Sequence, residues 1–273
     1  KMINMADYAA LAHAIEKKNI AELLKSNRRR DGRTKDEFRD VEIELNVVKT
    51  ALGSALVKLG KTQVIAGVKA QITSPYQDSA NKGSLMVGFE TSPLSAPGYR
   101  LGPPQPESIE IARMTDRAIR ESQCIDLEKL CIIEGEKVWQ IIVDLYTLDH
   151  SGNFYDAAII AAYAALCNTK LPDIKVDEEG NVEILETSKP LKLNAFPISV
   201  TTYKIDDHYI VDADLKEELI ADARITFGTT ETHIVSGQKG GMAGIKSTDI
   251  LEILKNSIQI ASDLRERIQS QLN

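Results

Sequence analysis

Three arginines in the middle of the chain have a spacing that could hold a nucleic acid. Arg113, Arg117 and Arg120 stand at positions i, i+4 and i+7, so in a helix they share one face. The guanidinium group pairs with phosphate oxygens without reading a base. Two interpretations are open: a solvated face paired to nearby acids such as Asp116 and Glu121, or a surface that contacts RNA.

A second group of cations runs from Arg28 to Arg33 and surrounds Asp31-Gly32, a pair that favours a bend. This segment is a strongly basic turn. Here too two interpretations are open, a solvated loop or a contact with RNA or with another subunit.

The remaining polar groups carry weaker signals. The glycine-rich run 237–244 resembles a phosphate-binding loop but lacks the Gly-Lys-Ser/Thr ending, so we predict a strand-to-helix turn. Asp149-His150-Ser151 has the residue types of a catalytic triad, but adjacent residues cannot adopt that geometry. Four acids could bind a divalent cation, although exposed hairpin acids are the simpler interpretation: Asp206, Asp207, Asp212 and Asp214. The histidines are too dispersed to supply ligands, so we expect no metal and no cofactor.

The composition limits what these residues can do. The 273 residues carry a formal net charge of −7, with 43% hydrophobic and 27% charged residues, as in ordinary globular proteins. A free-standing nucleic-acid-binding protein is usually basic, because phosphate neutralisation supplies much of its affinity. Any RNA contact must therefore be a local patch or must rely on a partner.

Nothing in the sequence indicates a membrane or export. No apolar run approaches the roughly 18 residues of a membrane helix, and Lys1 to Ile20 lacks the apolar core of a signal peptide. Cys124, Cys131 and Cys167 are scattered and form no CxxC pair. They indicate a reducing cytoplasm rather than a disulfide framework.

The stretch Gly53 to Ala70 predicts the hairpin around which the positioning elements are arranged. Apolar residues alternate on both sides of Gly60-Lys61, and Gly60 can adopt the positive φ of a tight turn. Because both strand faces are largely apolar, we expect this hairpin in the middle of a sheet that is covered on both faces.

Helices are predicted on either side of this sheet. Asn19 and Glu22 resemble a capping box that begins a helix at Ile20, within an N-terminal helical arm. Glu107 to Ser122 carries the three arginines, and Tyr155 to Cys167 is apolar nearly all round, which indicates burial. A long C-terminal helix has apolar residues at spacings of three and four: Leu251, Leu254, Ile258, Ala261, Leu264 and Ile268.

Strands followed by a helix occur twice, which predicts an α+β fold of two similar halves. We expect a helical arm at 1–27, a first half at 28–190 and a second half at 191–273. The boundary follows an acidic, turn-rich stretch. The loop from Ser92 to Pro106 is long for a compact domain, and such loops are often functional.

Two motifs add a family resemblance that covers nearly the whole chain. Arg30-Asp31-Gly32-Arg33 and the hairpin GSALVKLGKTQVIAGVK resemble the opening of the RNase PH family of phosphorolytic exoribonucleases. The stretch GPPQPESIEIARMTDRAIRES resembles the non-catalytic RNase PH-like subunits of the archaeal exosome ring. The resemblance implies an RNase PH-like fold of two packed halves.

The resemblance also implies which catalytic parts are missing. Catalytic members carry two arginines just before the Ile-Glu-Ile of the middle helix, where this chain has Pro106, Glu107 and Ser108. Their phosphate-binding turn ends in an arginine, where this chain has Phe154. Their catalytic aspartate falls on Arg224, with Asp222 nearby. We therefore expect the fold without the reaction.

The resemblance thus predicts a non-catalytic subunit of a ring that degrades RNA 3′→5′ with phosphate. Three copies would alternate with three copies of a catalytic paralogue beneath RNA-binding caps, and Arg113, Arg117 and Arg120 would contact RNA. One alternative is a self-sufficient phosphorolytic exoribonuclease acting as a homo-oligomer, which the missing arginines disfavour. Another is a stand-alone RNA-binding module, which the −7 charge and the lack of an aromatic stacking platform disfavour.

Overall fold

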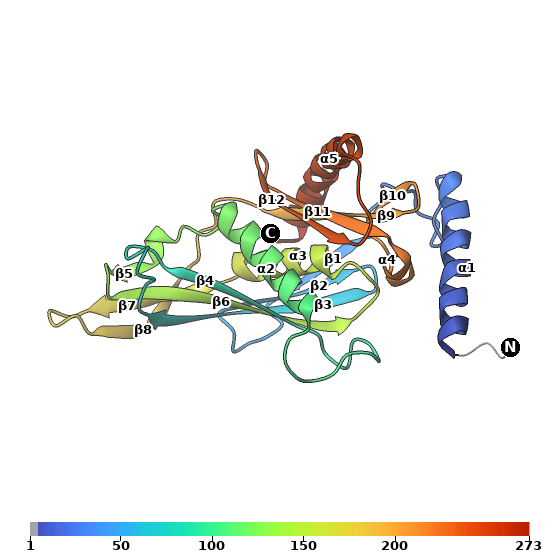
Figure 1. Cartoon of the computed structure of the whole chain (residues 1–273). Coiled ribbons are helices and arrows are strands. Elements are labelled where there is room, and N and C mark those ends of the chain that lie inside the picture. The colour runs from blue at the N-terminus through green and yellow to red at the C-terminus, as the bar shows by residue number, and fades with distance from the viewer. Residues whose placement is uncertain (1–4, 273) are drawn as a thin grey trace.

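The computed structural model describes the backbone of residues 5–272 and the side chains of residues 14–272. Its layers stack in the order first sheet, helices α2 and α3, second sheet and helix α5, with helix α1 at one side (Figure 1). The helices are α1 (Met5–Lys25), α2 (Pro106–Glu121), α3 (Phe154–Cys167), α4 (Leu215–Ile220) and α5 (Ser247–Leu272), and Glu128–Leu130 forms a short 3-10 helix. None of these helices is long and apolar enough to cross a bilayer.

The first sheet is built on the predicted hairpin. Its strands are β1 (Val41–Leu45), β2 (Gly53–Leu59), β3 (Thr62–Thr73), β4 (Ser84–Glu90), β5 (Cys131–Ile133) and β6 (Lys137–Asp149). Their order is β1-β2-β3-β6-β4, with β5 on β6, and only β4 runs parallel to its neighbour. Leu59 pairs with Thr62 across the turn, where Gly60 has a φ of +55°. The hairpin and its central place are confirmed.

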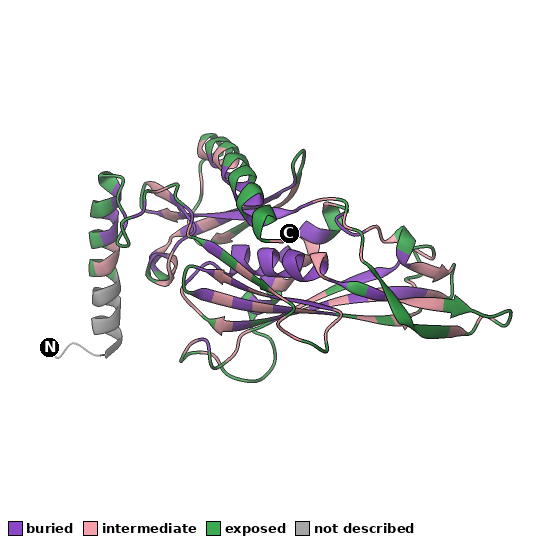
Figure 2. Ribbon diagram, turned by 180° about the vertical axis from the view of Figure 1, so that it is seen from behind, coloured by how far each residue is buried: buried purple, intermediate pink, exposed green. Residues whose placement is uncertain are grey.

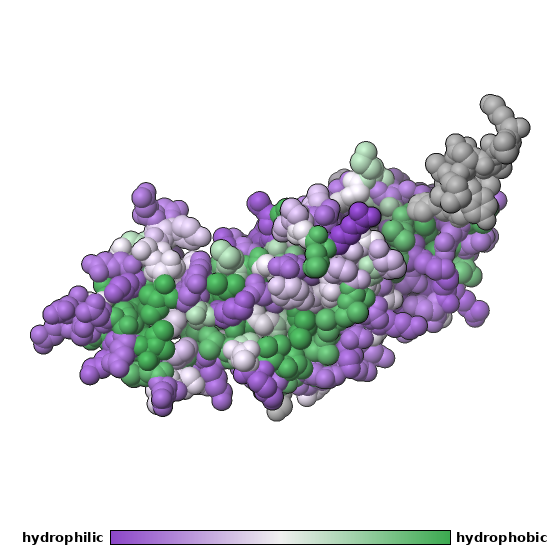
Figure 3. All heavy atoms as spheres, turned by 90° about the horizontal axis from the view of Figure 1, so that it is seen from below, coloured by the Kyte–Doolittle hydropathy of each residue, from purple (hydrophilic) through white to green (hydrophobic). Residues whose placement is uncertain are grey.

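Only one face of this sheet is covered by the chain itself, so the prediction of two covered faces is wrong. Ala55, Val57, Val64 and Ala66 are fully buried against α3. On the opposite face the side chains are partly exposed, and Figure 3, which views the molecule from that side, shows apolar surface between charged groups. Strand periodicity reports that both faces are apolar, but it does not report that a second layer exists.

The second sheet is a four-stranded antiparallel sheet of order β10-β9-β11-β12. Its strands are β9 (Ile198–Ile205), β10 (His208–Val211), β11 (Ala223–Thr229) and β12 (Ile234–Gly241). The run from Gly237 to Gly241 therefore lies within β12 and pairs with β11. The predicted strand-to-helix turn is therefore wrong at 237–241, which continue the strand, and confirmed at 242–244, which lie between β12 and α5.

Helix α3 forms the centre of the molecule, as predicted. Every residue from Phe154 to Leu166 is buried, and the ribbon in Figure 2 is coloured as buried almost throughout this helix. Helix α5 covers the outer face of the second sheet. Its buried stripe is Ile253, Ile260, Ala261, Leu264 and Ile268, whereas Leu251 and Ile258, which share the same apolar period, are exposed.

The N-terminal arm is helical within the described residues, but it does not begin where the capping box suggested. Helix α1 is continuous from Met5 to Lys25, so Asn19 lies inside it. Ile20 and Leu24 pack against Tyr203 and Ile205 of β9.

A hairpin of β7 (Lys170–Val176) and β8 (Val182–Pro190) protrudes at the far end from α1 (Figure 1). In the sequence it lies between α3 and β9, the first strand of the second sheet.

Candidate functional site at the junction of the two sheets

Three of the residues that the family resemblance singled out, Pro106, Glu107 and Arg224, line one cavity of about 420 Å³ between the two sheets. Helix α2 contributes its first turns, α3 its first residues, and β9, β11 and α4 the opposite wall. The charged and aromatic side chains that line it are Glu107, Glu110, Tyr155, Tyr203, Glu218 and Arg224. This cavity therefore contains three carboxylates and a single cation.

Arg224 of β11 is enclosed by partners rather than offered to a ligand. Its Nη2 donates a hydrogen bond to Glu110 Oε2 at 2.6 Å and another to the Tyr155 hydroxyl. The guanidinium lies 3.9 Å above the centre of the Tyr155 ring. Gly240 of β12 leaves the space for it, because a Cβ there would lie 2.0 Å from Nη1. Arg224 is thus the matched cation of this junction.

Glu110 of α2 uses both carboxylate oxygens. Oε2 accepts hydrogen bonds from Arg224 and from the Tyr155 hydroxyl at 3.3 Å, and Oε1 accepts one from Gln238 at 3.2 Å. Sequence reasoning missed Tyr155 and Gln238, because a contact between a helix and a strand 128 residues later leaves no local pattern.

Glu218 is held inside the junction. The Tyr203 hydroxyl donates to its Oε1 at 2.9 Å, and the Asn153 backbone N–H donates to its Oε2 at 2.9 Å. Burial raises the pKa of this carboxyl, and the two hydrogen bonds oppose that rise.

The three amides of the turn Ser151–Asn153, just before α3, all donate within the chain. The Ser151 N–H donates to the Thr62 hydroxyl at 3.2 Å, and the Gly152 N–H donates to His150 Nδ1 at 3.4 Å. The Asn153 N–H is taken by Glu218. Burial lowers the pKa of His150 to about 4, so the ring is neutral and Nδ1 can accept.

Phe154 closes the same turn from the other side. It is 2% exposed, stacks on His150 with ring centres 4.2 Å apart, and meets the edge of Phe89 at 5.7 Å. An aromatic side chain in this place packs into the core and offers no donor to phosphate. The sequence-based expectation that this position cannot bind phosphate agrees with that geometry.

In the basic turn Arg28 to Arg33, Arg29 and Arg33 are neither solvated nor free for RNA, so both interpretations fail at these two residues, whereas Arg28 and Arg30 are exposed. Arg29 is 3% exposed and forms an ion pair with the buried Glu217. Its Nη atoms also donate to the carbonyls of Val211 and Asp212 at 2.9 Å. These arginines join the N-terminal segment to the second sheet.

Asp212 is the centre of that junction and corrects a second expectation. It is fully buried, not an exposed hairpin acid, and accepts from Arg33 Nη1 at 3.0 Å and from Arg39 Nη2 at 2.6 Å. Although burial opposes it, the hydrogen bonds and charges of these arginines lower the pKa of Asp212. Asp214 instead caps α4. Among the residues searched in the structure, no cluster of His, Cys, Asp or Glu could hold a metal ion.

The α2 arginines lie outside this network. Ile111, Met114 and Ala118 bury one face of the helix, which leaves Arg113 exposed and Arg117 half-buried. Neither forms a hydrogen bond or an ion pair with any residue that the structure describes. Arg120 is exposed and pairs with Asp116 at 2.6 Å. Among the described residues, the arginine stripe of α2 therefore has two arginines without an acidic partner and one, Arg120, that is paired.

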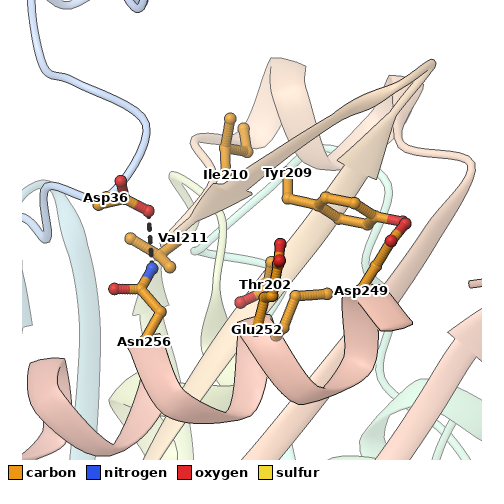
Figure 4. Close-up of a pocket in the computed structure, with 9 residues that line it drawn as sticks. Asp36, Thr202, Tyr209, Ile210, Val211, Asp249, Glu252 and Asn256 are labelled. Carbon is orange, nitrogen blue, oxygen red and sulfur yellow. Dashed lines mark hydrogen bonds between the residues drawn. The ribbon is translucent and has the colours of Figure 1, made fainter. Parts of the chain in front are cut away.

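A smaller cavity of about 210 Å³ lies on the opposite face of β9, against α5 (Figure 4). Thr202 faces it, whereas the next residue, Tyr203, faces the larger cavity. Asn256 donates to Asp36 at one end and Tyr209 to Asp249 at the other, each at 2.7 Å. No cationic side chain lines it, so it is unsuited to phosphate.

The sequence matches the 3′ exoribonuclease family, domain 1 over residues 37–172 and domain 2 over residues 195–260. The Exosome complex component Rrp42 of Thermococcus kodakarensis is 43% identical over 257 residues, which cover 93% of this chain and 94% of that protein. The protein of the same name from Methanothermobacter thermautotrophicus is 41% identical over 273 residues, covering 99% of each.

The fold is also similar to that of a solved exosome chain. In the Archaeoglobus fulgidus exosome with RNA bound to the active site, one chain superimposes with a TM-score of 0.86 at 42% identity. The superposition covers 94% of this chain and 99% of that one.

Proposed function

The chain belongs to the RNase PH family of 3′ exoribonucleases, and we propose that it is an exosome ring subunit that guides RNA without cleaving it. The family and the RNase PH-like fold confirm the resemblance read from the sequence. Relatives named as exosome components, matched over nearly their whole length, support its place in such a ring.

One observation carries the non-catalytic part of the proposal. Phosphorolysis requires donors that hold inorganic phosphate beside the scissile bond. The three amides of the Ser151–Asn153 turn donate within the chain, and Phe154 packs into the core. The one cation of the adjacent cavity, Arg224, is bound to Glu110. Phosphate would therefore have to displace internal acceptors and meet carboxylates.

The RNA-guiding part rests on the α2 arginines. Arg113 and Arg117 are accessible and unmatched, and such guanidinium groups pair readily with phosphate oxygens. Arg120 lies on the same face but already pairs with Asp116, so its share of the contact is smaller. An acidic chain can use this patch in a ring whose partner supplies most of the positive charge.

The finer features of the ring also belong to this proposal. We expect three copies to alternate with three copies of a catalytic RNase PH-like paralogue, with RNA-binding cap subunits on one side. The partly exposed apolar face of the first sheet and the protruding β7–β8 hairpin are surfaces that neighbours could cover. The free thiols of Cys124, Cys131 and Cys167 suit a cytoplasmic location.

The domain division stays part of the proposal as well. We place the arm at residues 1–27, the first half at 28–190 and the second half at 191–273. The two family matches lie on either side of the proposed 190/191 boundary.

Reconstitution with a candidate catalytic paralogue tests this function. The two proteins should co-purify, and the mass of the complex should equal three copies of each. Phosphate-dependent degradation of poly(A) by the mixture should exceed that of the paralogue alone. A complex that never forms, or a mixture no more active than the paralogue, would contradict the proposal.

A further inference from the structure

Glu110 stands in an unfavourable place for a helix that contacts RNA. It precedes Arg113 by three residues and Arg117 by seven, so all three side chains project from one side of α2. A glutamate at this spacing ordinarily pairs with the following arginine. If unpaired, it would place a negative charge beside the phosphates. Either outcome would weaken the patch.

The structure avoids both outcomes by turning Glu110 toward the second sheet. Arg224 and Tyr155 occupy its Oε2 and Gln238 occupies its Oε1. Arg113, in contrast, has no hydrogen bond or ion pair to any part of the chain that the structure describes. The carboxylate is thus neutralised away from the patch, and Arg113 stays free.

We propose that Arg224 is a positioning residue for RNA binding, because it holds Glu110 away from Arg113 and so keeps Arg113 available to a phosphate. The inference rests on the proposed function, since it names how the patch on α2 stays unpaired. It also gives a role to the cation that stands where catalytic relatives are expected to carry an aspartate.

The surroundings of Arg224 fit this role. The Tyr155 ring supports the guanidinium from one side, and Gly240 leaves room for it on the other. Arg224 Nη1 is buried without a hydrogen-bond partner among the described residues. The position of the side chain therefore leaves one of its own donor groups unsatisfied. What its position does achieve is the bond from Nη2 to Glu110.

Three variants separate masking of Glu110 from simple packing. In the ring reconstituted with its catalytic paralogue, Arg224→Met should weaken binding of a short oligo(A) about fivefold and reduce the salt dependence by about 0.7, the value for one phosphate contact. Glu110→Gln should bind at least as well as the wild type. The double variant Glu110→Gln with Arg224→Met should recover wild-type affinity, because residue 110 then carries no charge that could capture Arg113, while Asp116 stays paired with Arg120.

A packing role predicts a different pattern. Glu110→Gln breaks the same ion pair, so it would then weaken binding as Arg224→Met does, and the double variant would not recover. That pattern, with rings of normal mass, would overturn the inference.

A second measurement does not depend on RNA. In the NMR spectrum of the full chain alone, the side-chain Nε–H signal of Arg113 should become protected in Arg224→Met and return to its wild-type state in the double variant. An unchanged signal in Arg224→Met would refute capture by Glu110. If Arg113→Glu with Arg117→Glu leaves RNA affinity unchanged, the proposed function fails, and this spectrum still decides whether Arg224 controls the pairing.

Discussion

The arginines of the two regions differ in what surrounds them, not in their chemistry. In the network that joins the N-terminal segment to the second sheet, Arg29, Arg33 and Arg39 are largely buried and bound to Glu217 and Asp212. On α2 the arginines project to the surface, and two of them have no bound acid among the described residues. The first group joins segments of the chain, whereas the second is available to an external anion.

The comparison teaches that a cluster of arginines indicates a nucleic-acid site only where the nearby acids do not pair with those arginines. The basic turn has the denser cluster of arginines in the sequence, yet its Arg29 is buried in an ion pair with Glu217. Removing one member of a buried ion pair leaves an uncompensated charge, whereas exposed pairs contribute little. Mutations in the buried arginine network should therefore lower stability, whereas mutations of the α2 arginines should lower RNA affinity.

The largest effect is expected at Asp212, in the buried arginine network. Asp212→Asn leaves Arg33 and Arg39 without their shared carboxylate and should lower the free energy of unfolding by about 3–5 kcal/mol. Urea unfolding measures it. Asp206→Asn, at an exposed hairpin acid paired with Lys17, is the matched control and should cost less than about 1 kcal/mol. Equal losses would show that the arginine network is not special.

A smaller effect on stability should appear as a pH dependence. Asp156 is also fully buried but has hydroxyl and amide partners rather than arginines, and burial raises its pKa to about 7. The folded state thus keeps a proton that the unfolded state loses, so this residue's contribution to stability falls as the pH rises from about 4 to about 7.

Asp156→Asn should remove that decline. The unfolding free energies of the wild type and the variant should be measured by urea titration at several pH values. As the pH rises from about 4 to about 7, the wild type should lose stability relative to the variant. A difference that does not change with pH would show that Asp156 is ionised throughout this window.

On α2 the effect should appear in RNA binding instead. Arg113→Glu with Arg117→Glu should weaken oligo(A) binding by the reconstituted ring about tenfold or more and reduce its salt dependence by about 1.4, the value for two phosphate contacts. The matched control, lysine at both positions, keeps the charge and should retain most of the affinity. Unchanged affinity in the glutamate variant, with the ring intact, would make the stripe a solvated face.

The smallest effect is expected at the arginine that is already matched. Arg120 pairs with Asp116 one helical turn earlier, an exposed pair of about 0.3–0.5 kcal/mol. Arg120→Ala should therefore change RNA affinity less than Arg113→Ala does. The reverse order, seen in parallel titrations, would show that matching within the chain does not decide which arginines bind RNA.

The sequence predicts elements well wherever a local period carries them. The β2–β3 hairpin, the buried α3 and the shared face of the α2 arginines all follow from alternation or from helical spacing. The capping box at Asn19 failed because a continuous helix overrides a local cap signal. The prediction of a turn failed at the start of the glycine run, where Gly237 and Gly240 belong to β12 and make room for Phe227 and Arg224 on the neighbouring strand.

The candidate site was only partly accessible to sequence reasoning, because its contacts join distant segments. Comparison with the family motifs singled out Glu107, Phe154 and Arg224, yet no local pattern indicates that Arg224 meets Glu110 or that Arg29 meets Glu217. Such pairings depend on how the two sheets pack. A sequence reports where charges are, whereas the fold decides which of them cancel.

The central claim is that this chain cannot hold the phosphate that would cleave RNA. The most direct measurement is the release of nucleoside diphosphates from poly(A) by the purified chain alone, in the presence of inorganic phosphate, beside the same assay on the reconstituted ring. We predict release by the ring and none by the chain. Phosphate-dependent release by the chain alone, free of its partner, would contradict the account.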